Sequence, residues 1–194
     1  DSTVAIGALA LEKCTEGNFN VAVGYRAGDA ITTGDDNIFM GTDAGGSSQD
    51  VDLATIIGHG AGNGVLTSGA DGVVLVGAAA GAALTSGAYN TAIGYNACKT
   101  YTTKGYATAV GYKALEFNND DANVAIGYLA GQGVDGQSVT FESGVYIGSE
   151  AGKVLSTGDG NVLVGYHAGL ALTTGARNIA IGSTSMDALT QGDD

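Results

Sequence analysis

The sequence contains no proline among its 194 residues, and it has few charged side chains. Without proline, neither a collagen-like chain nor a polyproline linker can form. Charged residues make up 14% of the chain and hydrophobic ones 44%, a balance that argues against intrinsic disorder. Seven basic residues against 20 acidic ones leave a net charge of −13. A chain of this charge lacks the basic surface that nucleic acids require, and anionic lipid surfaces should repel it.

Other features that the sequence lacks exclude further classes of function. No apolar run approaches the roughly 18 residues of a membrane-spanning helix, and no signal peptide is visible, so we expect no membrane insertion. The two histidines, His59 and His167, are too far apart in the repeat described below to form a catalytic dyad or a metal cluster. Cys14 and Cys98 are likewise too distant to pair within one chain, and we expect two buried free thiols. We predict neither an enzyme nor a cofactor.

Glycine, in contrast, is abundant, with 34 residues, about twice its ordinary usage. The excess follows a repeat, because short β-branched runs such as NVAVG, NTAIG and NIAIG each end in glycine. The eleven closing glycines are Gly7, Gly24, Gly41, Gly58, Gly77, Gly94, Gly111, Gly127, Gly148, Gly165 and Gly182. Seven of their ten spacings are 17 residues, and the others are 19, 16 and 21. Residues 1–194 therefore form a single repeat domain.

Each run predicts a short β-strand with two apolar faces. The residue three before the closing glycine is β-branched in all eleven units, and the residue just before the glycine is Ile or Val in ten. These two positions lie on one face of a strand and the residue between them on the other. One face can fill the interior of a coil, so the other must be covered from outside, and we expect side-by-side association of chains.

The rest of the unit predicts tight corners. The third residue after the closing glycine is Ala in ten units, which indicates close backbone approach, and the next position suits a second short strand or a bend. A unit of about 17 residues is too short for two packed helices but sufficient for one coil of a β-solenoid, with coils stacked about 4.8 Å apart. The fold class we predict is all-β: a parallel β-roll of about eleven 17-residue coils.

The recurring runs NTAIGYNA, NVAIGYLAG and LTTGARNIAIG resemble the left-handed parallel β-roll heads of trimeric autotransporter adhesins of the YadA type, and still more the repeats of bacteriophage tail fibres. The resemblance covers nearly the whole chain. It implies a left-handed roll, a homotrimer, and a structural or adhesive segment of an extracellular fibre, on a virion or a bacterial surface, that presents a surface to a cell-surface receptor or glycan. Both ends lie inside the repeat frame, so we expect a fragment of a longer fibrous protein.

Several recurring side chains have a structural and a functional interpretation. Asparagine opens the strand in six units, where an amide ladder is expected. Tyrosine after the closing glycine could stack on sugars or simply cover the coil edge. Acidic turns such as 118–121 could bind calcium, but calcium-binding rolls repeat their carboxylates in every coil, which favours solvated turns. Thr/Ser pairs such as 32–33 could bind ice as an alternative function, or stabilise turns.

The departures from the repeat are the best candidates for a specific surface feature. The 21-residue interval between Gly127 and Gly148 inserts four residues, and the 19-residue interval ending at Gly77 adds two. Insertions in solenoids emerge as loops, often on the binding face. The alternative is a tolerated loop without a function. The candidate receptor-contact residues are Gln132, Asp135, Gln137, Phe141 and Glu142.

Overall fold

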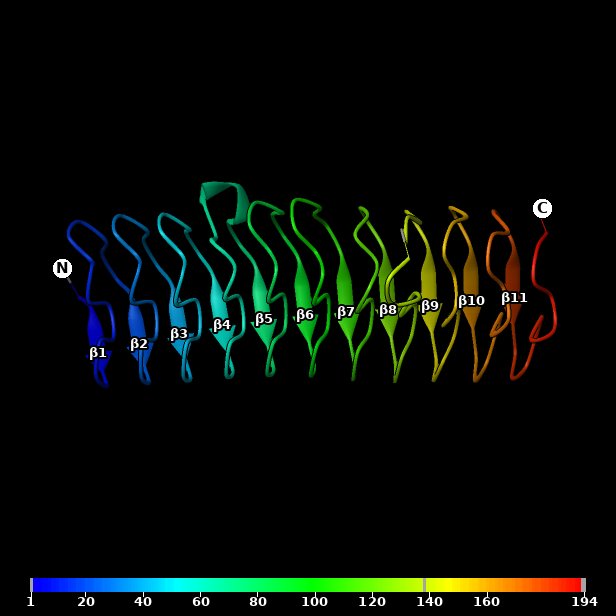
Figure 1. The fold of residues 1–194 in the computed structure, drawn as a ribbon, viewed down its shortest axis with the longest axis horizontal. Helices are drawn as coiled ribbons and strands as arrows, with labels where there is room; N and C mark the ends of the chain where they lie inside the picture. The colour runs from blue at the N-terminus through cyan, green and yellow to red at the C-terminus, as the bar shows by residue number, and fades with distance from the viewer. Residues whose placement is uncertain (1, 138, 193–194) are drawn as a thin grey trace.

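The chain folds into an all-β parallel solenoid of about ten turns, seen side-on in Figure 1. The structure, a computed structural model, describes residues 2–137 and 139–192. One three-residue strand forms in each repeat unit. The strands are β1 (Val4–Ile6), β2 (Val21–Val23), β3 (Ile38–Met40), β4 (Thr55–Ile57), β5 (Val74–Val76), β6 (Thr91–Ile93), β7 (Thr108–Val110), β8 (Val124–Ile126), β9 (Val145–Ile147), β10 (Val162–Val164) and β11 (Ile179–Ile181).

The eleven strands pair in chain order in one parallel sheet that runs the length of the rod. The register is the one the repeat predicts, since residues at the same position of successive units face each other, as Val162 faces Ile179 and Val145. The two termini lie at opposite ends of the rod (Figure 1). The structure thus confirms the solenoid and the register that the spacing of the closing glycines predicts.

The strand residues alternate between a buried and a partly exposed face, as predicted. The central residue of every strand from β2 to β11 is buried, whereas the two flanking residues remain partly or largely exposed. The side chains of Ile38, Ile93 and Ile126, for example, are 38 to 40% exposed on the outer face. The single chain therefore leaves the outer apolar face of its sheet uncovered.

The coil interior is filled mainly at two positions. One is the centre of the strand, and the other usually lies seven residues after the closing glycine. The coil with Phe39 at the first position has Ser48 at the second, whereas the coil with Ala92 has Tyr101, and all four are buried. In both of these coils a large buried side chain is accompanied by a small one, which keeps the interior close-packed.

The coil turns its corners with positive φ angles. The closing glycine has φ between 127° and 140°, a conformation open essentially to glycine. The residues two and four positions further on are left-handed in every unit, for example Lys113 at 57° and Leu115 at 52°. Of the two alternatives predicted for the fourth position, the bend is therefore the one observed, and no second strand per coil occurs among the described residues.

The two longer intervals leave the coil as local excursions. The 19-residue interval between β4 and β5 contains a 3₁₀ helix, η1 (Ser68–Ala70), which projects from the rod in Figure 1. The 21-residue interval between β8 and β9 forms an extended loop that rejoins the stack at Thr140, which bridges in parallel to Thr157. The sheet register continues unbroken past both.

Candidate functional site

The loop between β8 and β9 contains all five candidate contact residues, but the structure separates them. Asp135, Gln137 and Glu142 are exposed, and Gln132 is partly buried. Phe141 is fully buried and packs edge-to-face on Tyr146, with ring centroids 5.2 Å apart. It fills the coil interior because the inserted residues displace the usual core position, so Phe141 belongs to the core and offers no surface to a receptor.

Gln132 is held in a buried polar cluster. Its amide nitrogen donates to the Glu116 carboxylate at 2.8 Å, and Asn96 donates to the other carboxylate oxygen at 2.8 Å. Lys113 completes the cluster with its ammonium 3.3 Å from Glu116, whose side chain is only 1% exposed. Burial lowers the pKa of Lys113, but the hydrogen bond and ion pair with Glu116 outweigh it, so the net pKa is raised. Gln132 thus anchors the start of the loop to the neighbouring coils.

A hollow of about 310 Å³ opens beside the outer part of this loop. Its walls come from the loop itself and from two turns in the preceding coils. The lining residues are Thr100, Phe117, Asn119, Asp135, Gly136, Gln137, Val139 and Thr140. Asp135 and Gln137 are therefore brought together at one concave place, whereas Gln132, Phe141 and Glu142 are not part of its lining.

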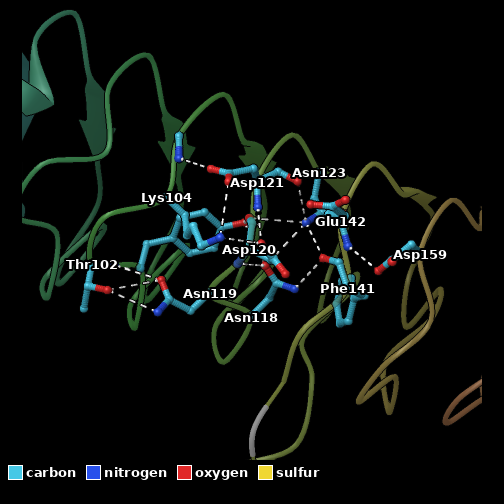
Figure 2. A network of polar contacts seen from close by, with 12 residues as sticks. Thr102, Lys104, Asn118, Asn119, Asp120, Asp121, Asn123, Phe141, Glu142 and Asp159 are labelled. Carbon is cyan, nitrogen blue, oxygen red and sulfur yellow. Dashed lines mark hydrogen bonds and ion pairs between the residues drawn. The ribbon is translucent and has the colours of Figure 1, made fainter.

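The acidic turn at 118–121 forms the polar network shown in Figure 2. The Asn119 side chain accepts a hydrogen bond from the Thr102 backbone at 3.0 Å and donates to the Thr102 hydroxyl at 3.1 Å. Lys104 pairs with Asp120 at 2.8 Å and with Asp121 at 3.3 Å. The hydrogen bonds to Asp120 and Asp121 raise the pKa of Lys104. The turn that supplies Asn119 to the hollow is thus fixed by its own contacts.

Two asparagines and a tyrosine extend this network into the interior. Asn118 and Asn123 both donate their amide nitrogens to the carbonyl of Phe141, at 3.0 and 2.7 Å. The buried Tyr101 hydroxyl lies 2.9 Å from the Asn118 side-chain oxygen and 2.8 Å from the Asp120 carbonyl, and its one hydrogen is shared between these two acceptors. The backbone that returns from the insertion at Phe141 is therefore tied to the coil before it.

The carboxylates of the acidic turns accept hydrogen bonds from backbone N–H groups of the preceding coil. The Asp35 carboxylate accepts the Asn18 backbone N–H at 2.5 Å, and the Asp52 carboxylate accepts that of Asp35 at 2.7 Å. The same contact links successive coils at Asp71, Asp121 and Asp159. The prediction of solvated turns missed this ladder, although its signal is in the sequence: an acid recurs two residues before the strand asparagine position. No group of three His, Cys, Asp or Glu side chains suited to a metal ion occurs among the described residues.

The strand asparagines form the predicted amide ladder. The Asn37 amide nitrogen donates to the Val51 carbonyl at 2.7 Å and to the Asn20 side chain at 3.0 Å. Its side-chain oxygen accepts the Ala54 N–H at 2.9 Å. The six members are buried: Asn20, Asn37, Asn90, Asn123, Asn161 and Asn178. The ladder satisfies backbone groups between coils and leaves the asparagines unavailable to a ligand.

Three rings of the tyrosine stripe stack on one another. The rings of Tyr95, Tyr112 and Tyr128 lie 5.4 Å apart between centroids, with interplanar angles of 14° and 13°. Both faces of the Tyr112 ring are therefore covered by its neighbours, so this ring offers no open face on which a sugar could stack. Tyr25 and Tyr166 lie outside this stack and are 50 and 52% exposed.

The first hydroxyl of the Thr/Ser pairs stabilises turns. Thr32 donates to the Gln49 carbonyl at 3.1 Å, and Thr85 donates to that of Thr102 at 2.9 Å, one coil further on. The second residue of most pairs stays on the surface, as Thr33 does. Because backbone carbonyls engage most of the first hydroxyls, the described pairs leave mainly the row of second hydroxyls for an ice surface to contact.

The two cysteines differ in burial. Cys98 is buried, as predicted, and burial raises the pKa of its thiol, whereas Cys14 is only partly buried.

No helix in the part of the chain that the structure describes is long and apolar enough to cross a membrane. Comparison of the chain with protein-family models, with curated proteins and with solved structures gives no significant match.

Proposed function

We propose that the chain is a rigid segment of an extracellular trimeric fibre, a phage tail fibre or a bacterial adhesin head, that projects a receptor-binding surface. The uncovered apolar face of the sheet is the observation that carries the proposal. Each strand has Ile, Val, Thr or Met at its two outer positions, and Ile6, Ile93, Ile126 and Ile147 are 36 to 59% exposed.

The size of this face supports association. Ten strand intervals give a stripe about 50 Å long, and its two outward residues per strand make it about 7 Å wide. Contiguous apolar patches of several hundred Å² on a single chain mark contact sites in many proteins. Water leaves this surface when chains pack against one another, and that burial is favourable at about 25 cal/mol per Å².

The shape of the rod favours packing around an axis parallel to its length. Each coil offers the same outward positions, so three rods in register would bring equivalent coils together along the whole face. The left-handed trimeric rolls that the sequence resembles have this arrangement. A rigid rod with several copies of one surface gains avidity from multivalent contact, which suits attachment to a cell surface.

Sedimentation of the purified chain tests the proposal. We expect a species of three times the 19.1 kDa chain mass. Replacing Ile93, Ile126 and Ile147 together by Lys should convert it to a monomer that keeps its β circular dichroism, because three charges per chain would have to be buried at the axis.

A matched variant separates the strand face from general loss of apolar surface. Leu53, Val65 and Leu189 are exposed at 38 to 63% and lie outside the strands. Their joint replacement by Lys should leave the trimer intact. A monomeric wild-type chain, or equal dissociation of both variants, contradicts the proposal.

A further inference from the structure

The hollow beside the β8–β9 loop combines an apolar wall with uncommitted polar groups. Phe117 and Val139 supply the apolar part, and Asp135 and Gln137 are exposed at its rim. Within the described residues, neither the Asp135 carboxylate nor the Gln137 amide has a hydrogen-bond or ion-pair partner. Polar side chains thus outnumber apolar ones in the lining, and convergent polar groups beside an apolar surface can orient a small ligand.

The polar groups of the hollow differ in how much hydrogen-bonding capacity they have left. The Asp135 carboxylate can accept hydrogen bonds at both of its oxygens, and the Gln137 amide can both accept and donate hydrogen bonds. Asn119 has one amide N–H beyond the one it gives to Thr102. The Thr100 hydroxyl already donates to the Glu116 carbonyl at 2.9 Å, so it can act only as an acceptor. Because the contacts in Figure 2 hold the Asn119 side chain, this polar group is in place before a ligand arrives.

The charge of the hollow restricts its ligand. Among the described lining residues there are one carboxylate and no basic side chain, and the chain carries a net charge of −13. Phosphates and acidic sugars would be repelled. A single carboxylate does not supply the six to eight oxygens that calcium requires. The hollow therefore disfavours anionic ligands, and its mixed lining suits a neutral ligand that offers both hydroxyl groups and an apolar C–H surface.

We propose that this hollow binds one neutral saccharide unit, with sugar hydroxyls donating to Asp135, the amides of Gln137 and Asn119 pairing with further hydroxyls, and the sugar C–H face lying against Phe117. The volume of about 310 Å³ is at the small end of ligand pockets, which suits a single ring. This inference rests on the proposed function, because a single-ring site gains useful strength only when the fibre repeats it.

The site is compatible with the proposed trimer. All of its described lining residues lie outside β1 to β11. Chains that associate through the outer strand face therefore need not cover it. Three copies of the hollow would be carried at the same height on one fibre.

Saturation-transfer NMR of the full chain with methyl glycosides tests the assignment. The probes are the neutral methyl glycosides of glucose, galactose, mannose, fucose and N-acetylglucosamine, and the acidic control is methyl glucuronide. Each glycoside is used at about 10 mM, a concentration at which dissociation constants near 1 mM can be detected. We expect saturation transfer to at least one neutral glycoside and none to the glucuronide. The double variant Asp135→Ala with Gln137→Ala should weaken binding at least about tenfold, because two hydrogen-bonding groups are lost.

A matched double variant controls for general surface effects. Gln49 and Asp187 are exposed and lie outside the hollow, so Gln49→Ala with Asp187→Ala should bind as the wild type does. Absence of transfer to every neutral glycoside, preference for the glucuronide, or undiminished binding by the Asp135 and Gln137 variant overturns the inference. The sedimentation experiment is independent of these results, so a trimer without saccharide binding would refute the hollow while leaving the fibre proposal standing.

Discussion

At the scale of single residues, two different demands explain where glycine occurs. Ten of the eleven closing glycines combine φ near 130° with a backbone contact, since a methyl group on Gly77, for example, would come within 2.6 Å of the Gly94 carbonyl. The left-handed positions two residues later demand only φ near 55°, and they accept Arg26, Lys113 or His167. Glycine is therefore fixed where conformation and space both require it, and variable where conformation alone does.

Replacing Gly77 by Ala should lower the free energy of unfolding by about 2–4 kcal/mol, since the new methyl group meets the next coil in a strained conformation. Gly60 is the matched control, because it has φ of 62° but no atom within 4 Å of an added methyl group. Gly60→Ala should cost only about 1–2 kcal/mol. Denaturant unfolding followed by circular dichroism measures both, and equal losses would show that contact between glycines is unimportant.

At the scale of the repeated element, side-chain ladders supplement strands of only three residues. Each strand supplies few backbone hydrogen bonds, so the corners need partners of their own. The asparagine ladder and the carboxylate ladder provide them by bonding to the backbone of an adjacent coil, as Asn37 does at Ala54 and Asp52 at Asp35. The polar residues of the repeat are thus part of what holds the coils together.

The Asn37→Ala variant should be destabilised by about 2–4 kcal/mol, because the Val51 carbonyl and the Ala54 N–H would stay buried without their partner. Asn63 is exposed, so Asn63→Ala should change the stability by less than about 0.5 kcal/mol. Thermal unfolding of the two variants side by side checks this. A similar midpoint for both would mean that the amide ladder contributes little.

At the scale of the whole molecule, the rod is one-dimensional. Every strand contacts only the strands before and after it, so stability should be a sum over coils and their interfaces. The insertions are tolerated for the same reason, since β8 and β9 pair normally across the 21-residue interval. The β8–β9 insertion in particular adds a local surface feature without altering the stack.

Deletion of residues 78–94, one complete 17-residue unit, should leave a shorter folded rod with about a tenth less β signal, because Gly77 would then precede Tyr95 in the frame of the repeat. Deletion of 78–85 leaves too few residues to complete a coil, and it should disrupt the pairing of β5 with β6. Circular dichroism and proteolysis compare the two. Equal folding of both deletions would contradict stacking in a fixed frame.

The sequence by itself determined the solenoid, its register and the asparagine ladder. These follow from local rules that recur about every 17 residues, so each unit reinforces the signal of the others. The excess of glycine and the absence of proline belong to the same pattern, since the corners need positive φ and coil-to-coil pairing needs every N–H.

Only the tertiary structure decided the conformation of the β8–β9 loop and which of its residues are buried. Nothing local to Phe141 distinguishes a core residue from a surface one, because its burial depends on how the longer loop re-enters the coil beside Tyr146. The hollow likewise joins Asp135 to Thr100 and Asn119, which lie in other coils. A repeat specifies what every coil shares, whereas the place where one coil departs from it is shaped by packing against its neighbours.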